Sequence, residues 1–376
     1  MKQTRILHCN NDNKNMGGAY LVERKLEPYI RQYGYIFDYM TMDEFVLNRN
    51  EQTDPLGDSK TFSARLRGNR ILGHIQLPFY VKKILKENPY KVVHIDIDSA
   101  WKAILYAVPA QKSGAKVLVH SHANGIDGSY KGLKSALHKV CKNILSRYTD
   151  KYIGCSQGAL EWLCPKNRLS QSAVITNGID NKEYFYSEEL RKNTRKELGL
   201  NEEFVLCNVG RINDNKNQIF LIDVLKALRE KISDAVLLLV GPYAEEGYGK
   251  IMQKVKAEKL DNYVIITGET NQVNKYLNAA DFFVLPSIFE GLSLASIEAQ
   301  RTGLKCLLST GNPPEASVTE MVIREPLDRG SKAWAELIVN EAYKNGVRSS
   351  MILNMENTME GMAKTLSGVY SALIGG

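Results

Sequence analysis

Two glutamates in the second half of the chain have the type and spacing of a ligand-binding pair. Glu290 and Glu298 stand eight positions apart in a segment, 286–299, that follows an apolar run and then takes on a helical pattern. Eight positions are a little over two helical turns, so the carboxylates would lie on roughly one face at different depths. The backbone amides of residues 291–294 would form a helix N-terminus, which suits a diphosphate. Ordinary helix-capping glutamates could give this spacing, but Glu298 falls within an apolar face, where an unpaired carboxylate is costly.

Two basic residues follow the first apolar run of the second half. The chain reads Val209-Gly210-Arg211 and continues to Lys216, and the glycine lets it turn away from a sheet. Arg211 and Lys216 would then place two cations at the end of a strand. Fixed cations stabilise a departing diphosphate without a metal, because positive charge stands where negative charge develops. The alternative is a solvated basic loop.

Paired glycines, Gly17 and Gly18, follow the first apolar run and open a helical pattern. Such a loop lets the backbone approach a phosphate or a sugar, with the helix dipole aimed at negative charge. The pattern is not GxGxxG and no Walker A sequence is present, which disfavours a dinucleotide dehydrogenase and a P-loop kinase. A simple tight turn is the alternative.

Two histidines, His120 and His122, alternate along an extended segment, so their side chains point to the same side. Metal binding is conceivable, but no third ligand is evident nearby in the sequence. A buried structural histidine is one reading. We favour the other, in which His122, at the carboxyl end of its strand, contacts a substrate.

Asp96 and Asp98 look like the DxD pair that binds a divalent metal and a nucleoside diphosphate in one class of sugar transferases. The favoured interpretation is structural. The pair ends a buried strand just before a helix that starts near Ser99, where an acidic residue caps the helix N-terminus.

Short apolar runs alternate with amphipathic stretches along the whole chain, which predicts strands and helices in turn. Runs that are apolar throughout belong in parallel sheets covered on both faces, and two such series predict an α/β fold with two doubly wound domains. The predicted strands are 5–9, 92–97, 117–120, 152–155 and 173–176, then 204–209, 236–240, 264–267, 282–285 and 306–309. The predicted helices are 17–33, 99–113, 132–148, 216–231, 246–259, 271–280 and 292–302.

The same pattern predicts the domain organisation. We expect an N-terminal domain over 1–180, a polar hinge over 181–202, a C-terminal domain over 203–350, and a last helix within 351–376 that packs back toward the first domain. The polar, aperiodic segment 46–70 is expected to be a surface loop. Ligands of open α/β sheets bind at the carboxyl ends of strands, so two facing domains would enclose a cleft.

The composition is that of a globular protein, since 44% of the 376 residues are hydrophobic and 24% are charged. No run approaches the ~18–20 apolar residues that cross a bilayer, and the first residues do not form a signal peptide. The six cysteines form no CxxC pair, which indicates reduced thiols. We therefore expect a cytoplasmic protein.

Charge is distributed unevenly between the two halves. Residues 1–180 hold 26 basic and 16 acidic residues, whereas residues 181–376 are mildly acidic, which predicts an anionic partner for the first half. A basic helix with an apolar stripe within 131–151 could lie on the anionic inner leaflet, or its stripe could pack on the sheet. Nucleic acid is disfavoured, because aromatic residues are not interleaved with the basic ones. The basic residues are Lys131, Lys134, Lys139, Lys142, Arg147 and Lys151.

Taken together, these motifs resemble the retaining, metal-independent glycosyltransferases of family 4, which have the GT-B fold of two Rossmann-like domains facing across a cleft. The sequences of these motifs are most similar to those of the bacterial exopolysaccharide and capsule members of the family. The resemblance covers nearly the whole chain. It rests on the motifs 16–19, 120–122, 177–180, 210–217 and 290–300.

This resemblance implies a role for each matching residue. Arg211 and Lys216 would hold the donor diphosphate, Glu298 the nucleotide ribose and Glu290 the donor-sugar hydroxyls, with His122 near sugar and acceptor. Catalysis would rest on His122, Arg211, Lys216 and Glu290, with no metal and no cofactor. The implied donor-binding residues are Gly17, Gly18, Gly210, Arg211, Lys216, Glu290, Gly291, Leu292, Ser293, Leu294 and Glu298. Relatives usually differ at Ser293 and often have glycine where this chain has Asn217, which bears on donor choice.

The expected reaction moves a hexose or N-acetylhexosamine from a nucleotide sugar to a hydroxyl of a growing surface polysaccharide that is expected to be lipid-linked. UDP is the expected carrier, with GDP left open. The alternatives are a nucleotide-sugar 2-epimerase of the same fold, whose additional catalytic groups we do not identify, and a non-catalytic nucleotide-sugar-binding subunit. Intact Arg211, Lys216, Glu290 and Glu298 argue against the subunit.

Overall fold

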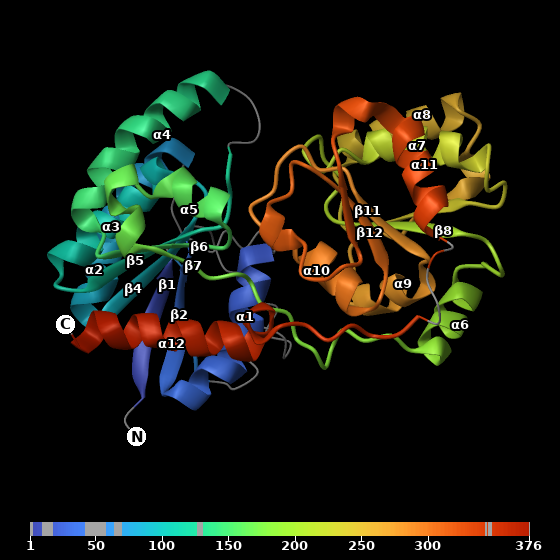
Figure 1. Cartoon of the computed structure of the whole chain (residues 1–376). Helices are drawn as coiled ribbons and strands as arrows, with labels where there is room; N and C mark the ends of the chain where they lie inside the picture. Colours follow the sequence, from blue (N-terminus) through green and yellow to red (C-terminus); the bar gives the residue numbers. More distant parts are fainter. Residues whose placement is uncertain are drawn as a thin grey trace. The chain divides into compact units, whose positions relative to one another are not determined.

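The computed structural model describes residues 3–9, 18–41, 58–63, 70–125, 131–342, 344 and 348–375. The chain forms two compact units (Figure 1). Unit 1 combines Met1–Gly178 with Met355–Gly376, and unit 2 is Ile179–Asn354. Each unit is described by itself.

Unit 1 is built on a seven-stranded sheet of order β3-β2-β1-β4-β5-β6-β7, and its paired strands are all parallel. Helices cover the sheet, and the C-terminal helix α12 packs against α1 and β4. The strands are β1 (Thr4–Cys9), β2 (Tyr35–Thr41), β3 (Thr61–Ser63), β4 (Val92–Ile97), β5 (Lys116–Ser121), β6 (Lys151–Gly154) and β7 (Ala173–Val174). The α-helices are α1 (Gly18–Ile30), α2 (Arg70–Glu87), α3 (Ala100–Lys112), α4 (Lys131–Leu145), α5 (Gln157–Leu163) and α12 (Met359–Gly375). Short 3-10 segments occupy Arg31–Tyr33, Ser146–Tyr148, Lys166–Gln171 and Met355–Asn357.

Unit 2 repeats the architecture with a six-stranded parallel sheet of order β10-β9-β8-β11-β12-β13. The strands are β8 (Val205–Val209), β9 (Val236–Val240), β10 (Val264–Ile266), β11 (Phe282–Leu285), β12 (Lys305–Ser309) and β13 (Val322–Glu325). The α-helices are α6 (Glu188–Glu197), α7 (Gln218–Arg229), α8 (Glu245–Ala257), α9 (Val273–Ala279), α10 (Leu294–Arg301) and α11 (Gly330–Ala342). Short 3-10 segments occupy Asp261–Tyr263, Pro314–Ala316 and Leu327–Arg329.

The central strands of unit 2 are buried on both faces, as is typical of a parallel sheet. All residues of β8, β9 and β11 are buried, so both faces of these strands are covered by helices, as the unbroken apolar runs predict. The two doubly wound α/β sheets of the prediction are confirmed, and the ten predicted strands all occur with ends shifted by at most a few residues. Within the part of the chain that the structure describes, no helix is long and apolar enough to span a bilayer.

Two predictions about loops are wrong. The expected hinge over 181–202 contains α6, whose Arg191 and Arg195 bind Asp281 at the start of β11, so this segment is part of unit 2. The expected loop over 46–70 contains β3, which pairs with β2, and Arg70, where α2 begins; the rest of it lies outside the described residues.

Another arginine, Arg348, ties α10, the helix that carries Glu298, to the strand layer. Arg348 donates hydrogen bonds to the carbonyls of Leu277 at 2.9 Å, Ala280 at 2.7 Å and Thr302 at 2.9 Å. Thr302 directly follows α10, so the guanidinium joins the end of that helix to the turn before β11. Burial is the main cause that lowers the pKa of Arg348 to about 10.

We predict that Arg348→Met destabilises unit 2 by about 3 kcal/mol, because several carbonyl oxygens lose a charged donor. Urea unfolding would measure the change. Arg329→Met is the matched control, since the Arg329 side chain is 69% exposed in its ion pair with Glu325. Equal stability of the two variants would contradict this role for Arg348.

Candidate functional site

Two glycines at the ends of neighbouring strands shape the loop that carries the predicted cations. Gly210 follows β8 and Gly241 follows β9, with φ of 153° and 138°. A Cβ on Gly241 would stand 2.5 Å from the Gly210 carbonyl oxygen, and one on Gly210 would stand 3.3 Å from Lys216 Cε. Only glycine allows this approach at both positions. The loop therefore folds back so that Lys216 covers the end of β8.

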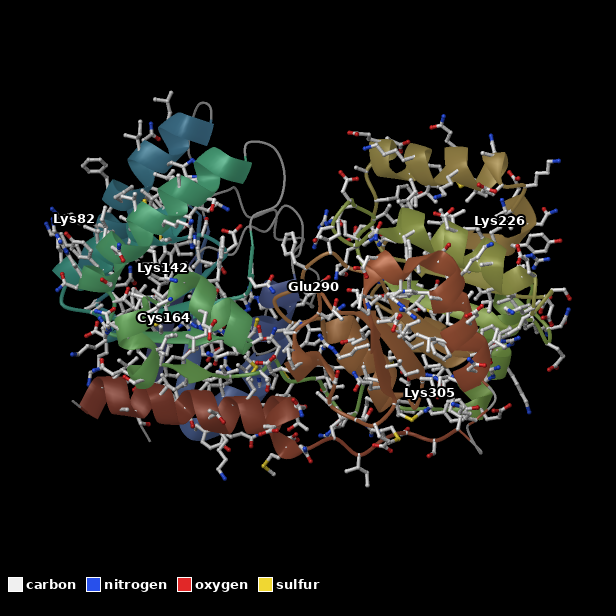
Figure 2. The ribbon with its side chains drawn as sticks, turned by 45° about the horizontal axis from the view of Figure 1, so that its top comes forward. Lys82, Lys142, Cys164, Lys226, Glu290 and Lys305 are labelled. Carbon is white, nitrogen blue, oxygen red and sulfur yellow. The ribbon has the colours of Figure 1, made fainter. Side chains whose placement is uncertain are left out.

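Lys216 and Glu290, predicted from separate motifs, come together in the structure. Lys216 Nζ lies 2.7 Å from Glu290 Oε1, and both side chains are largely shielded from solvent. Glu290 lies within the loop that joins β11 to α10, and it is labelled in Figure 2. A carboxylate held by a cation in this way is oriented rather than free, so a ligand that draws Lys216 away would also release Glu290.

Asparagines hold the two loops together. Asn215 donates from Nδ2 to the Phe289 carbonyl at 2.9 Å and accepts from the Phe289 amide at 3.2 Å. Its own carbonyl accepts from the Ile288 amide at 2.8 Å. Asn217, the N-cap of α7, has a left-handed backbone with φ of 57°. Asparagine tolerates that conformation better than most residues other than glycine.

The helix after Glu290 begins later than the sequence pattern predicts. Helix α10 starts at Leu294 with Ser293 as its N-cap, so Gly291 and Leu292 belong to the loop. The first amides of a helix have no intrahelical acceptor, so those at Leu294 and beyond can bind an anion. The sequence predicted that the amides of residues 291–294 form the helix N-terminus. In the structure, Leu294 alone of these residues belongs to the helix.

Glu298 is buried in α10, as its apolar neighbours predict. The Tyr184 hydroxyl lies beside the carboxylates of Glu298 and Glu183. Burial, together with the charges of Glu298 and Glu183, raises the pKa of Tyr184. The burial of Glu298 led us to expect a bound partner for it. Tyr184 lies beside this carboxylate within unit 2, and a ligand there stays a prediction.

In unit 1, the two predicted histidines join a buried cluster around one carboxylate. His120 Nδ1 and His122 Nε2 lie 3.3 Å and 3.0 Å from Asp96 Oδ1. On the other side, His8 Nδ1 lies 2.9 Å from Asp96 Oδ2, and His94 Nε2 lies 3.4 Å from Asp96 Oδ1. The two predicted rings do point to the same side, with centroids 4.0 Å apart.

Strand register brings this cluster together. Asp96 on β4 is paired with His120 on β5, and His94 on β4 is paired with His8 on β1. Alternate residues share a face, so these side chains gather on one face of the sheet. Tyr370 of α12 joins them there, with its hydroxyl 2.7 Å from His94 Nδ1.

The surroundings change the proton affinities of the cluster. Burial lowers the pKa of His94 well below its usual range and lowers that of His120 to about 4. Burial alone would raise the pKa of Asp96, but the imidazoles around it hold that pKa well below its ordinary value. At neutral pH the cluster therefore presents an ionised Asp96 carboxylate beside the neutral imidazoles of His94 and His120.

Sequence reasoning missed part of this cluster. His8 and His94 sit inside apolar runs, a position that could have singled them out. Asp98 does not share the site, since its side chain is exposed and pairs with Lys102 at 3.1 Å. It is not the N-cap of α3 either, which is Ser99. Gly17 lies outside the described residues, and Gly18 is the first residue of α1.

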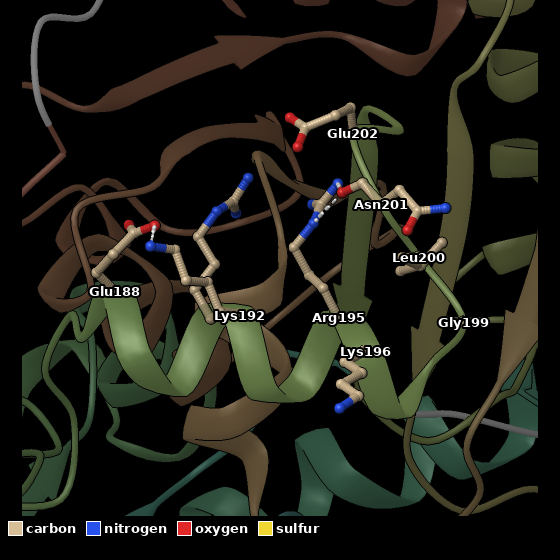
Figure 3. A pocket seen from close by; sticks show the side chains of 9 residues that line it. Glu188, Lys192, Arg195, Lys196, Gly199, Leu200, Asn201 and Glu202 are labelled. Carbon is tan, nitrogen blue, oxygen red and sulfur yellow. Dashed lines mark hydrogen bonds and ion pairs between the residues drawn. The ribbon is translucent and has the colours of Figure 1, made fainter.

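A separate surface pocket is lined by α6 and the loop that follows it (Figure 3). Two of its basic residues have nearby protein partners. Arg195 donates to the Asn201 carbonyl at 2.7 Å, and Lys192 pairs with Glu188 at 3.7 Å. These contacts are local to α6 and the loop after it, and the pocket gives no reason to place chemistry there.

Comparison with known families matches both halves of the chain. The family described as Glycosyl transferases group 1 matches residues 203–340, and Glycosyltransferase Family 4 matches residues 47–183. Together they cover more than half of the chain. The first match contains Gly210, Lys216, Glu290 and Glu298.

Individual relatives agree with this result. A galactosyltransferase of Escherichia coli, named UDP-Gal:alpha-D-GlcNAc-diphosphoundecaprenol alpha-1,3-galactosyltransferase, is 28% identical over 73% of this chain and 76% of its own length. The capsular polysaccharide biosynthesis glycosyltransferase CapH of Staphylococcus aureus is 26% identical over 69% and 71%. Among solved structures, Anabaena Alr3699/HepE in complex with UDP and glucose has a TM-score of 0.74 at 17% identity, over 98% of this chain and 95% of that one. That likeness shows a shared fold, and the predicted GT-B architecture is confirmed.

We predict that Asn215→Ala loosens the contact between the two loops, because the Phe289 amide and carbonyl lose their partner. The expected cost is about 1–2 kcal/mol of unit 2 stability. Hydrogen exchange of the amides at 288–290 should accelerate more than exchange elsewhere in unit 2.

Asn201→Ala is the control, because the hydrogen bonds of Asn201 come from its backbone. Unchanged exchange at 288–290 in Asn215→Ala would show that the loops are held by other contacts.

Proposed function

The chain belongs to the group 1, family 4 glycosyltransferases, enzymes of polysaccharide and capsule biosynthesis type, and from that premise we propose the reaction it catalyses. It transfers a hexose or N-acetylhexosamine from a nucleotide sugar, with UDP as the carrier, to a hydroxyl of a lipid-linked, growing surface polysaccharide. The anomeric configuration is retained. The donor binds without a metal.

The observation that carries this proposal is the Lys216–Glu290 pair at the end of β8, 2.7 Å apart. A donor diphosphate would take the Lys216 ammonium, aided by Arg211 and the first amides of α10. Glu290 would then be available to the sugar hydroxyls. One exchange of partners thus binds the leaving group and positions the sugar.

We propose retention from the resemblance to family 4, and the two carboxylates offer no covalent nucleophile that would achieve it by two displacements. Glu290 is held by Lys216, and Glu298 lies beside Tyr184, so neither is placed as a free nucleophile. We infer a displacement in which the acceptor hydroxyl attacks from the face that the diphosphate leaves. The leaving phosphate oxygen takes the hydroxyl proton, and Lys216 and Arg211 stabilise the negative charge that develops.

The donor and acceptor classes are supported by relatives. The Escherichia coli protein is named for UDP-galactose and a diphosphoundecaprenol acceptor, and CapH is named for capsular polysaccharide biosynthesis. Unit 1 would serve the acceptor, with His122 near it. Glu298 would bind the ribose after a change of partner from Tyr184.

We predict that UDP raises the melting temperature of the wild-type chain equally with and without EDTA. Lys216→Met should weaken UDP binding about 10- to 100-fold, because one charge-assisted hydrogen bond to phosphate is lost. Thermal shift across a UDP titration would measure both effects. Lys226→Met is the matched control, since Lys226 of α7 pairs with Glu258 on the surface of unit 2.

Each donor-induced shift is compared with the same protein in the same buffer. A shift that disappears on chelation would overturn metal-independent binding. A Lys216→Met variant that binds UDP like the wild type would overturn the site itself.

A surface of unit 1 supports the membrane part of the proposal. Helices α2 and α4 both pack on α3 in one layer (Figure 1), and each leaves an apolar stripe exposed at spacing i, i+3, i+7. Phe79 is 75% exposed and Val140 is 61% exposed. The exposed part of the α4 stripe supports a membrane contact, while Tyr148, after the helix, packs against the core of unit 1. The exposed apolar residues are Leu72, Ile75, Phe79, Leu137, Val140 and Ile144.

Lysines border this surface. Lys82, Lys83, Lys86 and Lys139 are exposed, and Figure 2 shows Lys82 at the outer edge of the helical layer. Lys142 is not among them, because its ammonium donates to the Glu161 carbonyl. Apolar side chains flanked by lysines suit an anionic bilayer surface, so we place the enzyme in the cytoplasm, peripheral on the inner face of the plasma membrane.

We predict that the wild-type chain floats with anionic vesicles, and that Phe79→Ser combined with Val140→Ser lowers its affinity at least about 10-fold, because buried apolar area is lost. Ile352→Ser is the control, since Ile352 is 95% exposed in unit 2. Binding should fall at high salt. Flotation that is equal for all three proteins would contradict a membrane role for this surface.

A further inference from the structure

The buried cluster of unit 1 contains more metal-binding groups than the proposed transfer reaction uses. Four histidines converge on Asp96, and Glu23 Oε2 lies 3.6 Å from His8 Nδ1. Both carboxylates are almost fully buried. Imidazole nitrogens beside buried carboxylate oxygens form a set of possible nitrogen and oxygen ligands.

We propose that Asp96, His120 and His122 bind one divalent transition-metal ion of the zinc class. Their ligand atoms lie within 4.8 Å of one another. Asp96 Oδ1 is 3.3 Å from His120 Nδ1 and 3.0 Å from His122 Nε2. Zinc bonds of about 2.0–2.1 Å place the ligands of a tetrahedral site about 3.3 Å apart, so these atoms need to move little.

The third ligand is what the sequence did not reveal. His120 and His122 form a His-x-His pair at the end of β5, and the strand register places Asp96 of β4 directly beside His120. Two histidines and one carboxylate leave a fourth position for water or another oxygen ligand.

A second group of three, His8, His94 and Asp96, also brings its ligand atoms within 4.8 Å. We assign the ion to the first group for two reasons. The Tyr370 hydroxyl already lies 2.7 Å from His94 Nδ1 and 3.3 Å from His8 Nε2. The His122 side chain retains 13% exposure, which leaves a route for an ion to enter.

The second group has a supporting role in this assignment. His8 Nδ1 lies 2.9 Å from Asp96 Oδ2, the oxygen that the ion would not use, and so orients the carboxylate. Such outer hydrogen bonds fix metal ligands. Glu23 Oε2 lies 3.6 Å from His8 Nδ1 and places a second buried carboxylate beside this supporting histidine.

Ligand chemistry selects the class of ion. Imidazole nitrogens suit zinc, cobalt, nickel or copper, whereas magnesium and calcium take oxygen ligands. The proposal differs from the sequence-based expectation of no metal in the chain. It concerns unit 1 alone and leaves metal-independent donor binding in unit 2 unchanged.

The test is cobalt binding by the chelator-treated full-length protein. Wild type should take up one equivalent of Co²⁺, develop visible absorption of a four- or five-coordinate site, and lose it when Zn²⁺ is added. His120→Asn and His122→Asn should each bind at least about 100-fold more weakly. His74→Asn is the control, because His74 lies on α2 against Trp101, away from the cluster.

Circular dichroism would show that each variant folds. If His120→Asn does not fold, His122→Asn decides, since its side chain is the more exposed of the two. Absence of the cobalt spectrum in folded wild type, or an equal spectrum in His122→Asn, would overturn the proposal and leave the cluster as a hydrogen-bonded network.

Discussion

The proposed donor site depends on one constraint, which is that the loops after β8 and β11 stay in contact at the carboxyl end of the second sheet. Strand pairing brings the loops near each other, because β8 and β11 are neighbours. Asn215 then fixes their backbones, and the Lys216–Glu290 pair holds the two charged groups between them. If the loops separated, the cation and the carboxylate could not act on one ligand. The glycines at 210 and 241 matter for the same reason, since they allow Lys216 to lie over the strand ends.

Unit 2 could be predicted from sequence to a large extent, because its strands are unbroken apolar runs. Val236–Val240 and Phe282–Leu285 match the predicted ranges, and the loops that follow strands contain the residues singled out for chemistry. What could not be predicted was the partner of each group. The sequence placed Glu290 and Lys216 in the loops after two separate strands, but only the three-dimensional structure shows that their side chains pair. The same holds for Glu298, whose partner Tyr184 lies more than a hundred positions earlier.

The fold of unit 1 was harder to predict from sequence, because its buried strands contain ionisable residues. β2 was not predicted, since Asp38 interrupts its apolar pattern, yet that carboxylate is buried and satisfied by the Arg5 guanidinium and the Tyr90 hydroxyl. Helix α6 was missed because it is strongly polar, and its arginines bind backbone carbonyls rather than solvent. In both cases a polar residue has partners distant in sequence, and composition alone predicts a loop.

The two units use the same topological position for different chemistry. Ligands of open parallel sheets bind at the carboxyl ends of strands, and both groups of residues stand there, after β8 and β11 in unit 2 and at the ends of β4 and β5 in unit 1. In unit 2, the N-terminus of α10 and Lys216 provide backbone amides and a cation, an arrangement that attracts an anion. In unit 1, buried histidines and Asp96 occupy the corresponding position, an arrangement that binds a cation or forms a hydrogen-bonded network. The degree of burial separates the two cases. Lys216 is partly exposed and can exchange the Glu290 carboxylate for a phosphate. Asp96 is buried, so losing its contacts with the imidazoles is costly unless an ion replaces them.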